Sequence, residues 1–320
     1  MIFTDENKGG FILKKRLIFI IVIFISIISG CENDVKEQED LIYTSIYPIQ
    51  FLTEQIVGNE VAVKSIIPPG VDAHSFELSS KEMTDIAKGE AFIFLGAGME
   101  SFAEATADAL NSQDVTLVEI GKHEELFMKN ESDDHHHGHE DDEHDHGDLD
   151  PHIWLDPLRM IDIGKLITAE LSALHPNNQK QYEENMNNLE KELTALDEQF
   201  VDVLSKKEDK HVLVNHAAFG YWEDRYGIKQ IAISGLSSSD EPSQKDLAKI
   251  TKLAEEKQLK YVLYDQTGSN RVAKIVQEHL GAEERVLHNL EVLTDEDINH
   301  KDDYFSLMKH NLNILDEVTN

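Results

Sequence analysis

Short apolar runs alternate with longer amphipathic stretches along most of the chain. Before residue 130 the apolar runs are β-branched or aromatic and are bounded by glycine, proline or charge, which predicts β-strands at 41–46, 61–67, 91–95 and 115–120. The stretches between them predict α-helices at 49–57, 80–88 and 100–110. Strands that alternate with helices are typical of an α/β domain with a parallel sheet.

The same alternation returns after residue 208. It predicts strands at 211–214, 230–233, 261–264 and 286–290, and helices at 217–225, 244–256, 270–280 and 304–318. A chain of 320 residues with 40% hydrophobic content is long enough to bury two medium cores. We therefore expect two four-stranded parallel (β/α) lobes, an N-terminal lobe over 41–176 and a C-terminal lobe over 208–320.

A long polar stretch at 177–207 separates the two alternating regions. Its apolar residues recur every three or four positions and so share one helical face: Tyr182, Met186, Leu189, Leu193, Leu196, Phe200 and Leu204. The span predicts one long helix that joins the lobes. The competing interpretation is the seam of a coiled-coil dimer; we expect a monomer, because the chain has no other heptad array.

The N-terminus has the layout of a secretory signal. Basic residues precede an apolar run at 17–28, and small Ser29 and Gly30 then lead to Cys31. This end resembles a bacterial lipobox, which implies cleavage before Cys31 and diacylglycerol on its sulfur. A transmembrane anchor and a free thiol are the alternatives, although the run is short for a membrane span. We expect a signal peptide over 1–30, a tether over 31–40, and a lipid-anchored protein on the extracytoplasmic face of the cell membrane.

The net charge of the chain limits the classes of ligand that it can bind. The chain has 29 Lys+Arg against 62 Asp+Glu, a formal net charge of −33. A basic face for nucleic-acid phosphates is therefore excluded, and cations are the expected ligands.

An acidic, histidine-dense run lies at 131–147. Its imidazoles, which stand among Asp, Glu and Gly residues, belong to His135, His136, His137, His139, His144 and His146. Imidazole and carboxylate are good ligands for zinc and similar divalent ions, so we expect an auxiliary loop that binds metal loosely. The alternative is a solvated linker.

Four single residues follow predicted strands. His74 follows the second strand, His152 the fourth, His216 the fifth and Glu291 the eighth. Ligands bind at the carboxyl ends of parallel strands, so two facing lobes would bring these residues into one cleft. Taken singly, His152 could be structural, His216 could cap a helix, and Glu291 could be a surface carboxylate.

Several motifs together resemble one family. The lipobox, GVDAHSFE, the histidine loop, DPHIWLDP, NHAAFGYW and DYFSLMKHNL look like the zinc-binding lipoproteins of bacterial metal ABC importers, of the ZnuA/AdcA type. The resemblance implies two (β/α) lobes joined by one long rigid helix, a metal site at the lobe interface, and an ABC permease with its ATPase as partners. It implies His74, His152 and His216 as ligands. The fourth ligand is a carboxylate or water in this family; Glu291 matches it best, and Asp265 is the weaker competitor.

The type of ligand favours zinc. Three imidazoles and one carboxylate suit tetrahedral zinc, whereas manganese prefers more oxygen ligands, and the family's manganese receptors replace the third histidine with a carboxylate. A nearly closed site argues against hydrolysis, and the HExxH, Gly-x-Ser-x-Gly and phosphate-loop motifs are missing. We therefore expect a zinc receptor and not an enzyme, with Asp72, Glu77 and Trp154 around the ligands. A manganese receptor and a surface adhesin or metal buffer stay open as alternatives.

Overall fold

The computed structural model describes residues 40–129, 149–237, 240, 242–267 and 271–320. Cys31 and the six loop histidines, for which lipid attachment and auxiliary metal binding are predicted, lie outside these residues. The described residues from Asp40 onward form one compact unit. Among the described helices, none combines the length and apolar character needed to cross a bilayer.

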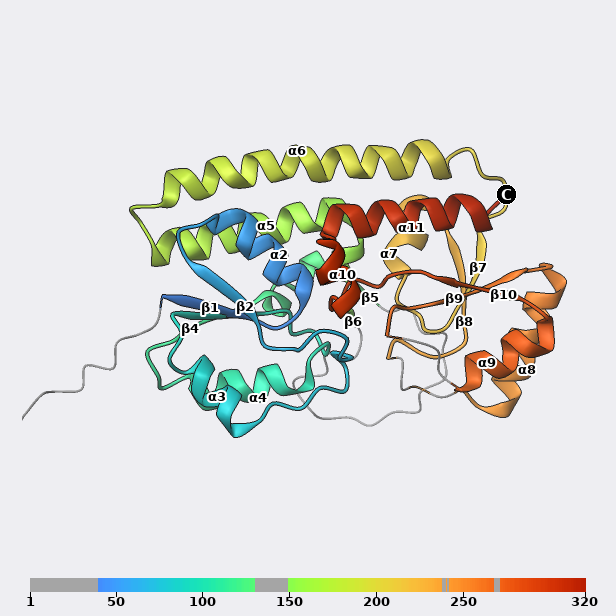
Figure 1. The fold of residues 1–320 in the computed structure, drawn as a ribbon, viewed down its shortest axis with the longest axis horizontal. Helices are drawn as coiled ribbons and strands as arrows, with labels where there is room; N and C mark the ends of the chain where they lie inside the picture. Colours follow the sequence, from blue (N-terminus) through green and yellow to red (C-terminus); the bar gives the residue numbers. More distant parts are fainter. Residues whose placement is uncertain (1–39, 130–148, 238–239, 241, 268–270) are drawn as a thin grey trace, which may run out of the picture. The chain divides into compact units, whose positions relative to one another are not determined.

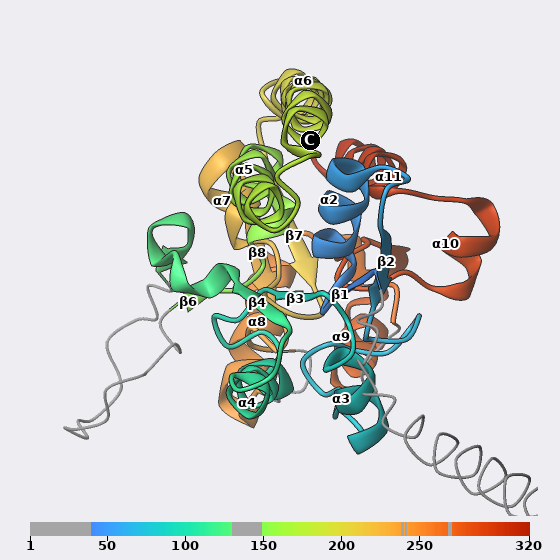
Figure 2. The same cartoon turned by 90° about the vertical axis from the view of Figure 1, so that its left-hand side faces the viewer.

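The first half of the described chain forms a four-stranded parallel sheet. Its strand order is β2-β1-β3-β4, built from β1 (Leu41–Thr44), β2 (Ala62–Ser65), β3 (Ala91–Phe94) and β4 (Thr116–Glu119). The connecting helices are α2 (Tyr47–Val57), α3 (Ser80–Ile86) and α4 (Ser101–Leu110). The β3 segment, AFIF, is buried throughout, as expected for a strand covered on both faces. Helices α3 and α4 lie on the opposite side of this sheet from α2 and α5 (Pro157–Leu174) (Figures 1 and 2).

The second half repeats this topology. Its strand order is β10-β9-β7-β8, built from β7 (His211–Val214), β8 (Lys229–Ala232), β9 (Tyr261–Tyr264) and β10 (Glu283–Val286), again all parallel. Its helices are α7 (Gly220–Tyr226), α8 (Gln244–Glu256), α9 (Arg271–Leu280), α10 (Asp295–His300) and α11 (Tyr304–Val318). In both sheets the first strand lies between the second and the third, and ligands bind at such switch points in open α/β sheets.

The eighth strand differs from the prediction. A strand at 286–290 is wrong, because β10 covers Glu283–Val286 and residues 287–290 continue into a loop. The sequence of β10, EERV, is mostly exposed at the edge of the sheet, so it lacks the apolar run that marks the other strands. Leu287 and Leu290 are apolar because they pack in the core from the loop.

Helix α6 (Gln179–Leu204) confirms the predicted long helix, with 26 residues. All seven apolar residues predicted for one face are buried, and the helix packs against α5, α2 and α11 (Figures 1 and 2). Burial of each large apolar side chain contributes about 1.5–3 kcal/mol. The apolar face is thus covered within the chain, and this helix does not offer a coiled-coil seam.

Candidate metal site

Three of the predicted ligands meet between the two sheets. One ligand atom from each of His74, His152 and His216 lies within 4.8 Å of the other two. The ring centroids of His74 and His216 both lie 5.6 Å from that of His152. His152 and His216 are fully buried, and His74 is partly buried. Three imidazoles whose ligand atoms converge in this way form a set of donors suited to a divalent metal.

His152 is held by the carboxylate of Asp150, which the sequence alone does not predict. After the short strand β6 (Leu149–Asp150), Asp150 Oδ1 accepts hydrogen bonds from His152 Nδ1 at 2.9 Å and from its backbone N at 3.0 Å. The proton therefore sits on Nδ1, and the lone pair of Nε2 is left for a metal. Nε2 is buried and has no hydrogen-bond partner among the described groups.

Asp150 is in turn positioned by the C-terminal half of the chain. Tyr221 donates its hydroxyl hydrogen bond to the Asp150 carbonyl at 2.8 Å. A Cβ atom at Gly220 would lie 2.4 Å from Asp150 Oδ2, so only glycine leaves room for this carboxylate. The Gly-Tyr pair of NHAAFGYW therefore supports His152 from the first element after His216. The D-x-H spacing of Asp150 and His152 is the one signal in the sequence for this contact.

His216 follows β7 and contacts a second carboxylate. Its Nδ1 lies 3.0 Å from Asp265 Oδ2, just after β9. Asp265 also accepts hydrogen bonds from Asn215 Nδ2 at 2.8 Å and from Thr267 Oγ1 at 3.0 Å. Burial acts to raise the Asp265 pKa, but the contacts with His216, Asn215 and Thr267 lower it overall. Asp265 is thus an ionised group engaged with three neighbours.

His74 lies in the loop between β2 and α3, where its Nε2 is buried without a hydrogen-bond partner in the described chain. Burial, followed by the neighbouring His152 and His216, lowers the pKa of His74 to about 4. Burial also lowers the pKa of His152. These imidazoles are therefore neutral at neutral pH, which is the form that binds metal.

Glu291 is 1% exposed, in contrast to a surface carboxylate. Burial, followed by the nearby Asp72 and Asp265, raises its pKa to about 8, while Asn289 and the Ala73 backbone act in the opposite direction. Neither carboxylate oxygen has a hydrogen bond of normal geometry within the described structure. Burial of an uncompensated carboxylate is costly, and a bound cation would offset that cost. Among the described residues, the tight ligand group nevertheless consists of the three histidines alone.

The other residues expected around the ligands differ in burial. Trp154 is fully buried, its ring centroid lies 5.3 Å from that of His152, and its Nε1 donates to Asn289 O at 2.7 Å. Asp72 is partly buried and close enough to raise the Glu291 pKa. Glu77 is exposed, so it contributes little to excluding water.

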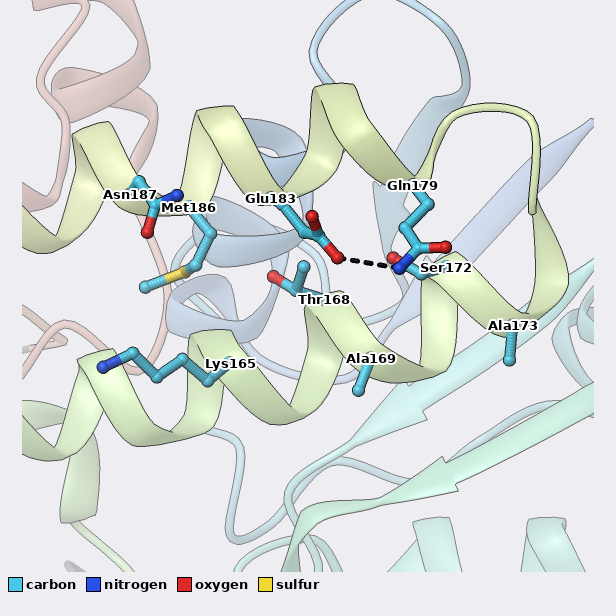
Figure 3. A pocket seen from close by; sticks show the side chains of 9 residues that line it. All are labelled: Lys165, Thr168, Ala169, Ser172, Ala173, Gln179, Glu183, Met186 and Asn187. Carbon is cyan, nitrogen blue, oxygen red and sulfur yellow. Dashed lines mark hydrogen bonds between the residues drawn. The ribbon is translucent and has the colours of Figure 1, made fainter.

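A groove of about 620 Å³ between α5 and α6 offers a different kind of site (Figure 3). Its polar groups largely bond within the chain: Gln179 donates to Glu183 at 2.8 Å, and Lys165 donates to Glu190 at 2.9 Å. Only Ser172 Oγ is buried there without a partner among the described groups. None of the candidate ligands lines this groove, so the metal chemistry belongs to the histidine cluster.

Comparison with known proteins shows the family to which the chain belongs. The family model "Zinc-uptake complex component A periplasmic" matches residues 42–318. The chain belongs to this family. The family match confirms the resemblance that the motifs indicate, and it covers both sheets and the long helix.

Two relatives illustrate the match. The zinc-binding lipoprotein AdcA of Streptococcus pneumoniae is 30% identical over 308 residues, which cover 96% of this chain but 61% of AdcA. The high-affinity zinc uptake system protein ZnuA of Bacillus subtilis is 30% identical over 305 residues, 93% of this chain and 95% of ZnuA. The chain thus spans less than two thirds of the length of its AdcA relatives.

Solved structures confirm the predicted fold class. The Zn(II)-bound ZnuA-like domain of S. pneumoniae AdcA matches with a TM-score of 0.72 and 30% identity, over 88% of this chain and 99% of that domain. The laminin-binding adhesin Lmb of Streptococcus agalactiae has a TM-score of 0.75 at 24% identity, over 87% of this chain and 99% of Lmb, and shows the fold alone.

Proposed function

We propose that this protein is an extracytoplasmic receptor that captures Zn²⁺ and delivers it to the permease of an ABC importer. The observation that carries the proposal is the buried convergence of His74, His152 and His216, whose Nε2 atoms have no hydrogen-bond partner among the described groups. Buried polar atoms without partners are rare, and three that converge are best explained by a metal ion.

Zinc is the metal that this ligand set fits best. We assign His74, His152 and His216 as three ligands and the Glu291 carboxylate as the fourth, which gives the N₃O tetrahedral set that zinc accepts. Asp265 is the weaker candidate because it already contacts the His216 ring at 3.0 Å, where it can orient that ligand. The relatives are named for zinc, and a Zn(II)-bound structure is among those that share this fold.

Receptor function follows from the same geometry. A fourth protein ligand would close the coordination sphere, so no position would remain for a reactive water. The family is named for zinc uptake and not for catalysis. We infer a binding protein in which the lobes over 41–176 and 208–320 enclose the ion and the helix region 177–207 links them.

The remaining partners are assigned as follows. The permease and its ATPase would receive the ion, and a diacylglycerol on Cys31 would tether the receptor, as a monomer, to the outer face of the membrane. The six loop histidines, His135, His136, His137, His139, His144 and His146, would collect zinc near the site. The chain has 62 acidic and 29 basic residues, and this negative charge favours the binding of cations and disfavours the binding of nucleic acid.

Zinc-limited cells that lack the gene test this function. Wild-type protein should restore uptake of radioactive zinc, whereas His152→Ala, made and anchored in equal amount, should not, because it removes a buried ligand. His310→Ala, at an exposed position on α11, is the matched control and should restore uptake. Full zinc uptake by the His152→Ala strain, or restoration of manganese uptake in place of zinc uptake, would contradict the proposal.

A further inference from the structure

The loop between β10 and α10 carries Glu291. The residue before it has an unfavourable backbone conformation. Leu290 has a φ of 63°, in the left-handed region that L-residues other than asparagine and aspartate rarely adopt. Such a residue persists only where its surroundings hold it. Its position directly before Glu291 means that whatever holds Leu290 also sets the direction of the Glu291 side chain.

A buried histidine outside the ligand group holds Leu290. His288 is 3% exposed, and its Nδ1 accepts a hydrogen bond from Leu290 N at 2.9 Å. Because Nδ1 is an acceptor, the ring proton lies on Nε2, which is 3.1 Å from Asp297 Oδ2. The ring therefore connects the first turn of α10 to the backbone of the left-handed residue.

His288 is itself anchored on both sides. Its backbone N donates to Asn311 Oδ1 at 2.8 Å, and Asn311 Nδ2 donates to the His288 carbonyl at 2.7 Å, so α11 fixes the peptide. Asp297 Oδ2 also accepts from the Thr294 backbone N and from Thr294 Oγ1, both at 2.7 Å, which fixes the carboxylate at the start of α10. A ring with both ends fixed can position a neighbour accurately.

The backbone of Glu291 is also fixed on both sides. Its N donates to Asn289 Oδ1 at 3.1 Å, and its carbonyl accepts from Tyr47 N, in the first lobe, at 2.9 Å. The carboxylate is then the only polar part of Glu291 without a normal hydrogen bond within the described chain. The loop therefore holds one buried carboxylate without a normal hydrogen bond among the described groups.

We propose that His288 is a positioning residue of the zinc site, which holds the left-handed turn at Leu290 so that the Glu291 carboxylate points at the metal. This inference rests on the proposed function, because it requires Glu291 to be a ligand. His288 does not contact the metal; it acts through the hydrogen bond from Leu290 N. Groups that orient a ligand in this way are typically worth ~10–100-fold in metal affinity.

Two substitutions of His288 test the roles of its two ring nitrogens separately. His288→Asn keeps an oxygen near the place of Nδ1, where it can still accept from Leu290 N. His288→Gln extends an amide toward Asp297 but leaves no acceptor near Leu290 N. We expect His288→Gln to lower zinc affinity ~10–100-fold and His288→Asn to stay close to wild type, as measured by competition with a chromophoric chelator on the lipid-free full-length protein. His310→Gln, at an exposed site, is the matched control.

The Glu291→Gln background isolates the positioning role. Without the carboxylate, His288→Gln should cause no further loss of zinc affinity, whereas a general loosening of the site would still lower it. Equal losses in both backgrounds, or an unchanged affinity of His288→Gln when Glu291→Gln alone weakens binding, would overturn the positioning role and leave the proposed function intact. An unchanged affinity of Glu291→Gln itself would instead refute the ligand assignment.

Thermal unfolding of the metal-free variants monitors folding. If His288→Gln does not fold, Asp297→Asn replaces it, because a neutral amide oxygen is a weaker acceptor for His288 Nε2 and the two Thr294 donors than the ionised carboxylate oxygen. The expected result is a loss of zinc affinity in the wild-type background that disappears in Glu291→Gln. The same loss in both backgrounds, or no loss in either, would overturn the proposal.

Discussion

At the scale of single residues, two carboxylates lie beside the histidines of the candidate site. Asp150 Oδ1 accepts a hydrogen bond from His152 Nδ1 at 2.9 Å, and Asp265 Oδ2 lies 3.0 Å from His216 Nδ1. A histidine whose tautomer is fixed in this way loses less freedom on binding a metal and is a more basic ligand. Of the three candidate ligand histidines, His152 and His216 are the most deeply buried, and these two have a carboxylate beside Nδ1.

Asp150→Ala should therefore weaken zinc binding although every ligand remains. We expect a loss of ~10–100-fold in affinity, because the His152 ring is then free to rotate and to exchange tautomers. Chelator competition at neutral pH measures it. Asp162→Ala, at an exposed position of α5, should leave the affinity unchanged, and an Asp150→Ala protein with wild-type affinity would show that the hydrogen bond has no role in binding.

The buried carboxylate of Glu100 predicts how the stability of the fold depends on pH. Glu100 is 1% exposed and accepts hydrogen bonds from the backbone N atoms of Leu95 and Gly96, at 3.0 and 2.9 Å, in the turn after β3. Burial raises its pKa from 4.5 to about 7, and hydrogen bonds with Ser45, Leu95 and Gly96 offset part of the shift. The folded protein thus favours the protonated group.

The stabilisation linked to this proton is complete below pH 4.5 and is lost as the pH rises through about 7. Relative to Glu100→Gln, which does not titrate, the wild-type free energy of unfolding should fall by about 3 kcal/mol over that window. Urea unfolding of both metal-free proteins at several pH values measures the difference. A difference that is constant with pH would refute the raised pKa.

At the scale of elements, periodicity predicts the long helix well because its apolar face packs within the chain. Leu193 lies on the apolar face of α6 and is fully buried, whereas Val201 on the same helix is 45% exposed. Leu193→Ala should lower the free energy of unfolding by about 2–5 kcal/mol. Val201→Ala is the control and should change it by less than about 0.5 kcal/mol. Urea unfolding measures both, and similar effects at the two sites would contradict the packing of α6.

The central strands could also be predicted from sequence, since covered strands must be apolar. The edge strand β10 could not, because an exposed EERV segment pairs through its backbone and needs no apolar side chain. For this reason the sequence does not predict a strand at 283–285, and it predicts one at 286–290, where the apolar residues after 286 belong to a loop. A local run of apolar residues indicates that these residues are buried. It predicts a strand only where the buried residues also pair with a neighbouring strand.

The candidate ligands were predictable and their supports were not. His74, His152 and His216 follow strands in the sequence, so the rule that ligands gather at carboxyl ends of strands brings them together. The contact of Asp150 with His152 depends on the missing Cβ of Gly220, which lies 70 residues further along the chain. The role of His288 depends on contacts with α10 and α11. Such roles arise only when distant elements pack.

At the scale of the whole described unit, the loop that carries Glu291 is bonded to the first lobe. Tyr47 N donates to Glu291 O at 2.9 Å, and Gly70 N donates to Leu293 O at 2.8 Å. Trp154 Nε1 adds a third bond, to Asn289 O at 2.7 Å. Glu291 is therefore held by the first lobe as well as the second, and release of a metal by separation of the lobes would require these bonds to break.

A competitive zinc and manganese titration tests the metal site most directly. It uses residues 32–320, stripped of metal and lacking 131–147, so that the histidine loop cannot contribute. We expect one tight zinc ion that outcompetes manganese and is lost on His216→Ala. If zinc binding disappears with the loop, or manganese outcompetes zinc, the site of His74, His152, His216 and Glu291 is not a zinc receptor site.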